Sequence, residues 1–300
     1  MRLKESAGWV SNSIEIRALI HQLIRGMSRE NRKGKVAMRL KEKVALVSGS
    51  GSGIGEATVK RLASEGAAVV VVDLNEEGAN RVAAEIRKSG GAAEALKANV
   101  GNPPEIESMV KFAVDKFGHL DILHNNAIRL YTGRIGEMTL ENWRKSVDIG
   151  LTSYWYATRC ALNVMVPRGN GAIVNTASVS GLAADYGLGA YNAIKAGVIN
   201  LTRATAIEYA RKGIRCNAVC PGSILTPPIV KSRNASPELA ARMAQAIPMG
   251  RYGEPNEIAN VVLFLVSDES SYVNGTCIVA DGGLMAHTGF PSITGAGPDW

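Results

Sequence analysis

The sequence predicts a single α/β domain with a doubly wound, parallel, seven-stranded sheet and helices on both faces. Apolar runs of strand length alternate with helical stretches from residue 43 to about residue 280. A helix lies between most neighbouring strands, which favours parallel pairing and coverage of both sheet faces. Neither a second α/β series nor a long linker indicates another domain.

The first strand, 44–47, is a buried apolar run, and a glycine-rich turn separates it from the helix that starts at residue 54. The second strand, 68–73, contains four consecutive valines and ends in Asp73. The other strands are expected at 93–98, 122–124, 172–176, 215–219 and 276–279. Helices are expected at 54–65, 76–89, 104–117, 140–166, 190–211, 236–246 and 256–266. The first six strands and their helices form the two halves of a doubly wound fold.

Residues 1–37 differ from the rest of the chain. Apolar residues at helical spacing alternate there with charged ones, and eight Lys or Arg against three Glu give a charge of +5. This basic amphipathic extension could be a packing arm, a membrane-surface or targeting helix, or an artefact of the start site. A start at Met38 is favoured, because residues 38–42 repeat the first five residues of the chain.

Composition excludes several classes of protein. The chain carries a net charge of +7, and subtracting the +5 of the extension leaves +2, so no nucleic-acid partner is expected. No run of eighteen apolar residues is present, so no membrane span is expected. The spacing of the four cysteines, Cys160, Cys216, Cys220 and Cys277, indicates neither a zinc site nor a disulfide scaffold. We therefore expect a cytoplasmic protein with reduced thiols and no metal.

The glycine-rich turn after the first strand predicts a dinucleotide site. Glycines let the backbone turn tightly and approach a pyrophosphate, and the following helix N-terminus offers free N–H groups and a positive dipole end. The residues expected to bind there are Gly49, Ser52, Gly53, Ile54 and Gly55. A strand before the turn and a helix after it provide the context that such a motif needs.

Asp73 closes the second strand, eighteen residues after Gly55. A carboxylate at that position accepts hydrogen bonds from the ribose diol of adenosine and repels a 2′-phosphate. No Lys or Arg lies in the glycine turn or directly after Asp73. The sequence therefore favours NAD over NADP, with the alternative that Asp73 merely caps the next turn.

Ser178, Tyr191 and Lys195 are the candidate catalytic residues. Tyr191 and Lys195 are four residues apart, so their side chains share one face of a helix, and Ser178 precedes Tyr191 by thirteen residues. With an upstream dinucleotide motif, this set indicates proton transfer to or from an alcohol or carbonyl oxygen. A Tyr-x-x-x-Lys pattern alone would mean little, because it arises often by chance.

Residues 38 to about 285 resemble the classical short-chain dehydrogenase/reductase family, which has a Rossmann-like fold. The ordered motifs that carry the resemblance are Ser48-Gly49-x-x-x-Gly53-Ile54-Gly55, Asn125-Asn126-Ala127-Ile128, Asn175-Thr176-Ala177-Ser178, Tyr191-x-x-x-Lys195, Pro221-Gly222 and Asp281-Gly282-Gly283. The resemblance further implies cofactor contacts from Asn99, Val100, Asn126, Ala127, Tyr191, Lys195, Pro221, Gly222, Ile224 and Thr226.

The resemblance implies a mechanism. Tyr191 would be the general base in alcohol oxidation, and Ser178 would hold the substrate oxygen by a hydrogen bond. The positive charges of Lys195 and the oxidised nicotinamide would lower the pKa of Tyr191 from its ordinary value of about 10. Lys195 would also reach the nicotinamide ribose.

Two departures from the family pattern stand out. Gly150 occupies the position of an Asn that bends a helix and holds a water in the proton relay to the Lys, so Gly150 can supply the bend but no side chain. Ile128 stands where the family has Gly. Because a β-branched residue tolerates positive φ poorly, we expect a locally different turn.

Substrate specificity is expected from 129–131, 179–186, Ser223 and a hinged lid at about 227–250. Apolar residues in and next to these segments, Leu182, Tyr186, Leu188, Ile229, Met243 and Met249, favour a cyclic or aliphatic secondary alcohol.

The family resemblance implies a homodimer or homotetramer built through the fourth and fifth helices. The leading hypothesis is an NAD-dependent secondary-alcohol dehydrogenase or ketone reductase. Alternatives are a reductase of activated C=C bonds, which Gly150 favours, and a non-catalytic NAD-binding protein.

Overall fold

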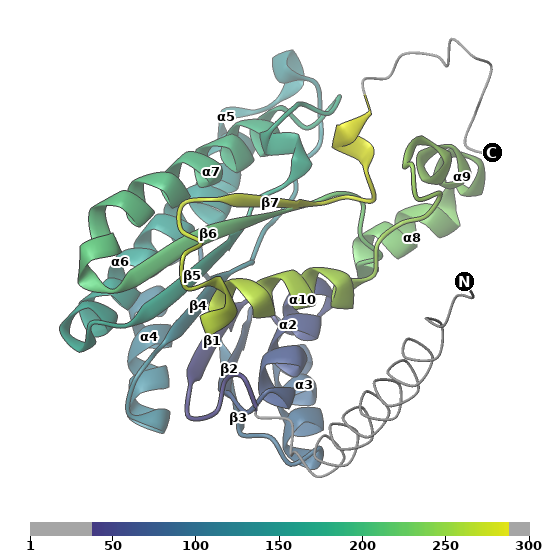
Figure 1. Cartoon of the computed structure of the whole chain (residues 1–300). Coiled ribbons are helices and arrows are strands. Elements are labelled where there is room, and N and C mark those ends of the chain that lie inside the picture. Colours follow the sequence, from purple (N-terminus) through teal and green to yellow (C-terminus); the bar gives the residue numbers. More distant parts are fainter. Residues whose placement is uncertain (1–37, 288–300) are drawn as a thin grey trace, which may run out of the picture. The chain divides into compact units, whose positions relative to one another are not determined.

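The structure, a computed structural model, describes residues 38–287, and the predicted N-terminal extension lies outside the described residues. The elements described below all belong to the unit that begins at Arg39. Its strands form one parallel sheet in the order β3-β2-β1-β4-β5-β6-β7 (Figure 1). The predicted α/β class, with seven parallel strands and helices between them, is confirmed.

The strands lie close to their predicted positions. Their bounds are β1 Val44–Ser48, β2 Ala68–Asp73, β3 Ala93–Lys97, β4 Ile122–Asn125, β5 Gly171–Thr176, β6 Ile214–Pro221 and β7 Cys277–Ala280. Every residue of β1, β4 and β5 is buried, because helices cover both faces of these central strands.

The α-helices are α2 Gly53–Ser64, α3 Glu76–Lys88, α4 Pro103–Phe117, α5 Leu140–Val147, α6 Ser153–Met165, α7 Gly189–Tyr209, α8 Pro227–Ala235, α9 Pro237–Ala246 and α10 Pro255–Val266. Two of them show clear start signals. The side chain of Asn75 accepts a hydrogen bond from the Gly78 N–H at the start of α3, and Glu254 and Glu257 form a capping box at the start of α10.

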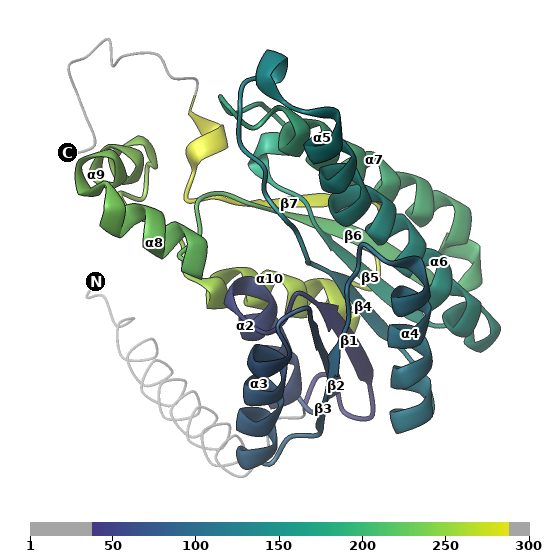
Figure 2. The ribbon, with the colours of Figure 1, turned by 180° about the vertical axis from the view of Figure 1, so that it is seen from behind.

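The helices form two layers around the sheet. Apolar residues of α2, α3 and α10, including Val59, Val82 and Val262, pack on one face. Those of α4 and α6, including Met109 and Ala161, pack on the other face, where α7 joins them (Figures 1 and 2). Helices α8 and α9 follow the carboxyl end of β6 and lie outside both layers.

The strand order places the predicted site. Successive strands run outward from β1 to β3, and the chain then crosses back so that β4 lies on the other side of β1. At this reversal the loops after β1 and β4 diverge to opposite faces, which opens a crevice at the carboxyl ends of the two strands. The glycine turn follows β1, and Asn126 follows β4, so both lie at this point.

Two helical segments differ from prediction. The helix predicted at 140–166 is divided, because a π-helical turn, Asp148–Thr152, joins α5 to α6 with Gly150 at its centre. The segment before residue 236 was not predicted to be helical, yet it forms α8. None of the residues of α8 is buried, so the helix lacks the apolar stripe that reveals a helix in a sequence.

Candidate active site

The glycine turn is shaped by contacts that only glycine allows. Gly49 has a φ of +65°, and a Cβ there would lie 2.8 Å from the Cα of Ala127. A Cβ at Gly55 would lie 2.1 Å from the carbonyl oxygen of Gly49, inside any acceptable contact distance. Ser52, which precedes α2, makes no side-chain cap, so the first N–H groups of α2 remain available to an anion. The turn therefore fits a pyrophosphate.

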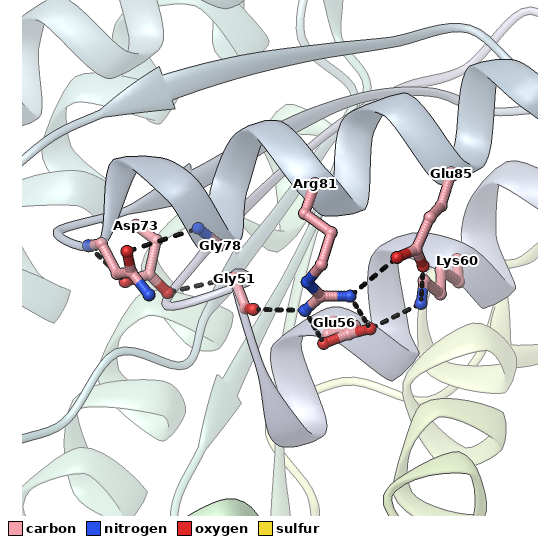
Figure 3. Close-up of polar contacts among 8 residues, drawn as sticks. Gly51, Glu56, Lys60, Asp73, Gly78, Arg81 and Glu85 are labelled. Carbon is pink, nitrogen blue, oxygen red and sulfur yellow. Dashed lines mark hydrogen bonds and ion pairs between the residues drawn. The ribbon is translucent and has the colours of Figure 1, made fainter.

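Asp73 connects the end of β2 to this turn (Figure 3). Its Oδ2 accepts a hydrogen bond from the Gly51 N–H at 2.8 Å, and its Oδ1 accepts one from the Asn75 N–H at 2.9 Å. The carboxylate thus does cap the next turn, as the alternative expected. It also lies against the glycine turn, where a ribose diol would bind.

Sequence reasoning missed the ionic network beside Asp73, which joins α2 and α3 (Figure 3). The Arg81 guanidinium donates to the Gly51 carbonyl at 3.0 Å and forms ion pairs with Glu56 at 2.7 Å and Glu85 at 2.9 Å. Lys60 contacts the same two carboxylates. Arg81 lies thirty residues after Gly51, so no local motif could have revealed this contact.

Asn126 ties β4 and β5 to the glycine turn. Its Nδ2 donates to the carbonyls of Ser48 at 3.2 Å and Gly49 at 3.0 Å, and its Oδ1 accepts from the Thr176 hydroxyl at 3.2 Å. The N–H groups of Asn126 and Ala127 both donate to the Ser48 hydroxyl. Asn126 and Ala127 therefore line the turn, next to the place where the family resemblance implies a cofactor.

Ser178, Tyr191 and Lys195 come together at the carboxyl ends of β5 and β6. Ser178 follows β5, and its side chain lies close enough to Tyr191, near the start of α7, to lower the pKa of that tyrosine. Lys195 lies one helical turn further, with its Nζ 5.5 Å from the centre of the Tyr191 ring and 5.3 Å from that of Tyr154. The Lys195 ammonium donates to the Thr176 carbonyl at 2.6 Å.

The electrostatics differ from the expected lowering of the Tyr191 pKa. Removal from water raises the pKa of Tyr191, the nearby Ser178 hydroxyl lowers it, and the Asp185 carboxylate raises it further. Burial also lowers the pKa of Lys195 to about 7, so this amine is only partly charged near neutral pH. The Lys195 Nζ–H is directed at the Thr176 carbonyl. Lys195 therefore does not offset the rise in the Tyr191 pKa that desolvation causes.

The two departures from the family pattern are in contact. A Cβ at Gly150 would lie 2.8 Å from the Cδ1 of Ile128 and 2.8 Å from the Cγ2 of Ile194. Isoleucine side chains therefore fill the place of the expected Asn. Ile128 does not adopt positive φ, since Glu42 is the only described non-glycine residue that does.

The remaining predicted cofactor residues lie around the same edge of the sheet. The Thr226 methyl group would be 3.2 Å from a Cβ at Gly53, so Thr226 borders the turn. Asn99 accepts a hydrogen bond from the Gly101 N–H at 2.9 Å, which is ordinary turn chemistry. Pro221 ends β6, Gly222 donates its N–H to the Ala280 carbonyl, and Ile224 is buried beside Gly253. Ile54 lies in the first turn of α2, and Val100 follows Asn99 after β3.

The described part of the chain contains no group of His, Cys, Asp and Glu able to hold a metal ion. All four cysteines, which lie within that part, are free thiols. Over the same residues no helix is long and apolar enough to cross a bilayer.

The fold and this turn define a dinucleotide-binding protein of the doubly wound class. A family model described as enoyl-(acyl carrier protein) reductase matches residues 49–285. The chain belongs to the short-chain dehydrogenase/reductase family.

Known proteins of similar sequence and structure narrow the class. The chain is 43% identical over 245 residues to a cyclohexanol dehydrogenase from Acinetobacter sp. (strain SE19), a match that covers 81% of this chain and 95% of the relative. A levodione reductase structure matches with 38% identity and a TM-score of 0.79, over 83% of this chain and 99% of that one.

A third match is a putative NAD(P)-dependent gluconate 5-dehydrogenase from Beutenbergia cavernae with bound NADP. It shares 33% identity and a TM-score of 0.79, over 84% of this chain and all of that one. The chain is thus an oxidoreductase of this family that interconverts a secondary alcohol and a ketone, which confirms the leading hypothesis about the class of reaction and sets aside the non-catalytic alternative.

Proposed function

We propose that the chain is an NAD-dependent dehydrogenase of cyclic or aliphatic secondary alcohols, with Tyr191 as its general acid and base. The observation that carries the proposal is that the Ser178 and Tyr191 side chains lie close together, with the Lys195 Nζ 5.5 Å from the centre of the Tyr191 ring. A substrate oxygen between the two hydroxyls would meet both a proton acceptor and an orienting hydrogen bond.

Each side chain has a distinct task. Ser178 orients the alcohol oxygen, and Tyr191 accepts its proton during oxidation and returns one during reduction. Lys195, which is buried and donates to the Thr176 carbonyl, would reach the nicotinamide ribose, and the positive charge of bound NAD would favour the ionised form of Tyr191. The glycine turn and the start of α2 would hold the pyrophosphate of NAD, which accepts the hydride when bound.

NAD as the natural cofactor is supported by the groups around Asp73. The Asp73 carboxylate, bonded to the Gly51 N–H, would repel a 2′-phosphate. Cations of this region are already paired, with Arg81 and Lys60 contacting Glu56 and Glu85, and Lys97 contacting Glu76 at 3.3 Å. A 2′-phosphate would therefore meet one carboxylate and no unpaired cation among these three.

An apolar substrate is supported by the loops that follow the strands at the site. Exposed apolar side chains come from the segment after Ser178, including Leu182, and from α9 and the segment after it, including Met243 and Met249. The similarity to a cyclohexanol dehydrogenase agrees with this character. Segment 227–250, which contains α8 and α9, is proposed as the lid over such a substrate.

Reduction of a C=C bond is a second candidate, because the matching family model is described as an enoyl reductase. The intact Ser178, Tyr191 and Lys195 set favours alcohol chemistry. The two activities are separated by offering the enzyme a cyclic alcohol with NAD and an enoyl thioester with NADH.

The proposal is tested by NADH formation with a panel of cyclic and acyclic secondary alcohols and sugars, in the wild type and in Tyr191→Phe. We expect turnover of cyclic alcohols with NAD, a lower kcat/KM with NADP, and a loss of roughly 100-fold or more in Tyr191→Phe. NAD binding, measured by fluorescence, should survive the substitution. Full activity of Tyr191→Phe would refute the role of Tyr191, and equal use of NADP would refute the cofactor preference.

A homodimer or homotetramer is proposed through the exposed face of α6 and α7. That face presents a groove lined by both helices, and Trp155, about half exposed, lies on it. Light scattering should give a mass at least twice that of the chain, and Trp155→Glu should reduce it. The free cysteines support a reducing, cytoplasmic location, which cell fractionation would check.

A further inference from the structure

The hydroxyl of Ser178 begins a chain of hydrogen bonds that leads away from Tyr191. It donates to the Ser180 hydroxyl at 3.1 Å, and the Ser180 hydroxyl donates to Oδ2 of Asp185. The Ser180 N–H also donates to the Ser178 hydroxyl at 3.1 Å, which fixes the two serines relative to each other. Both serines are buried, but Asp185 is exposed, so the chain joins the candidate catalytic group to the surface.

Asp185 is held in place by the helix that carries Tyr191. Its N–H donates to Oδ1 of Asn192 at 3.3 Å, and Nδ2 of Asn192 donates to its carbonyl at 3.0 Å. Asn192 is the neighbour of Tyr191 on α7. The Asp185 carboxylate is near enough to raise the pKa of Tyr191 by its charge. The side chains of Ser178, Ser180, Asp185 and Tyr191 therefore lie together in one cluster.

The opposite side of Tyr191 offers no comparable route. Lys195 is fully buried, and the Thr176 carbonyl, a group without a proton to pass on, is its only hydrogen-bond acceptor among residues 38–287. Beyond it, Gly150 contributes no polar group, and the methyl groups of Ile128 and Ile194 fill the adjacent space. The buried Tyr154 hydroxyl donates to the same Thr176 carbonyl at 3.5 Å, so on this side the described residues form no hydrogen-bonded path from Tyr191 to the surface.

We propose that Ser178, Ser180 and Asp185 form the proton relay between Tyr191 and solvent. During oxidation the alcohol O–H bond breaks, its proton passes to Tyr191, and the hydride passes to NAD. The Tyr191 proton then moves to the Ser178 oxygen as Ser178 gives its own to Ser180, Ser180 gives its own to Asp185, and Asp185 releases it to water. Each hydroxyl is both donor and acceptor, so it can pass a proton on and then rotate back to its starting orientation. This inference rests on the proposed roles of Tyr191 and Ser178.

The relay is tested by timing proton release. Enzyme with bound NAD is mixed with the alcohol in a weak buffer that contains a pH indicator, and NADH formation is followed in the same single turnover. In the wild type the proton should appear together with NADH. In Asp185→Asn and Ser180→Ala it should lag behind NADH by roughly tenfold or more in rate. Added formate or acetate, which can reach the surface end of the relay, should restore proton release in Asp185→Asn.

Glu137→Gln is the matched control. Glu137 is another exposed carboxylate of this region, next to the segment in which Gly133 pairs with Leu188, but it is not part of the hydrogen-bond chain. It should release the proton at the wild-type rate, and Asp185→Glu should release it nearly as fast. All variants should bind NAD as the wild type does.

Proton release at the wild-type rate in both Asp185→Asn and Ser180→Ala would overturn the relay. So would a lag in Asp185→Asn that is accompanied by loss of NAD binding, because that result indicates a structural role. Neither outcome would alter the proposed role of Tyr191. That role is tested separately, and it would fail if Tyr191→Phe formed NADH at the wild-type rate.

Discussion

Two isoleucine side chains lie close to the position that a Cβ of residue 150 would take, so glycine fits there and a larger residue would crowd them. The Cδ1 of Ile128 and the Cγ2 of Ile194 each lie 2.8 Å from the position of the missing Cβ of Gly150. The sequence marks Gly150 and Ile128 as separate departures from the family pattern. Their contact could not be predicted, because the residues lie 22 positions apart and only the folded chain brings the loop after β4 against the π-helical turn.

Gly150→Ala therefore tests this packing by the sign of its effect. In an open helix, Ala in place of Gly stabilises by up to about 1 kcal/mol. Here we expect it to lower the free energy of unfolding by about 1–3 kcal/mol, because the new methyl group overlaps both isoleucines. Urea unfolding measures the change. In an Ile128→Val background, which removes the close Cδ1, the loss should be smaller, and an unchanged loss would show that Ile128 is not the obstacle.

The residues predicted from motifs are those whose roles depend on nearby residues in the sequence. The glycines after β1, Asp73 at the end of β2 and the Tyr191–Lys195 pair each depend on a few neighbouring residues, so local motifs, taken together, predict them. The sequence places Ser180 and Asp185 only within segment 179–186, which is expected to contribute to substrate specificity. Their hydrogen bonds depend on the path of the chain between β5 and α7, which sequence patterns do not specify.

At the scale of elements, α3 holds the glycine turn in place through Arg81. The guanidinium contacts the Gly51 carbonyl and also pairs with Glu56 of α2 and Glu85 of its own helix. Exposed ion pairs contribute little to stability. The contact with the turn matters more, because Gly51 also donates to Asp73 and so adjoins the place of the adenosine ribose.

We expect Arg81→Ala to weaken NAD binding about two- to tenfold, the value of one or two hydrogen bonds, with little change in thermal stability. Titration calorimetry measures the dissociation constant. Arg61→Ala is the control, because Arg61 on α2 pairs with Glu65 at 2.9 Å without touching the turn. Equal effects of the two substitutions would show that α3 does not support the turn.

Element prediction was accurate where apolar patterns are strong. All seven strands were placed within a few residues. Strands β1 and β2 form continuous apolar runs because both faces are covered, whereas β3 and β7 are mostly half-buried. The interruption between α5 and α6 was expected only as a bend. Helix α8 was not predicted, because none of its residues is buried and its sequence therefore shows no apolar stripe.

At the scale of the whole molecule, strand order follows from general rules more than from any residue. A parallel sheet with right-handed crossovers and a dinucleotide turn after β1 leaves few arrangements, and the observed order, reversing between β1 and β4, is one of them. The predicted crevice position follows from that reversal. The polar groups that the fold buries there could not be predicted, among them His124, which lies on β4 between Val47 and Val174.

The hydrogen bonds around His124 determine its protonation. Nδ2 of Asn126 donates to two carbonyls, so its Oδ1 must accept the proton of the Thr176 hydroxyl. The Thr176 oxygen then accepts from Nε2 of His124 at 2.8 Å, and Nδ1 is left as a buried atom without a hydrogen-bond partner. Burial and the nearby Lys195 lower the pKa of His124 to about 3. The folded protein therefore holds this imidazole neutral.

Acid should consequently destabilise the molecule well before its carboxylates titrate. Between pH 6.5 and 4.5 the unfolded chain binds a proton at His124 and the folded chain does not, so stability falls as pH falls. Lys195, with a folded pKa of about 7, titrates mainly above this window, and the paired carboxylates Glu65 and Glu257, with pKa values of about 2, titrate below it. We expect His124→Gln, which can still donate to Thr176, to remove a slope of about 1.4 kcal/mol per pH unit from the free energy of unfolding. Urea unfolding of both proteins from pH 7 to pH 5 measures that slope, and parallel curves would mean that His124 is protonated in the folded state.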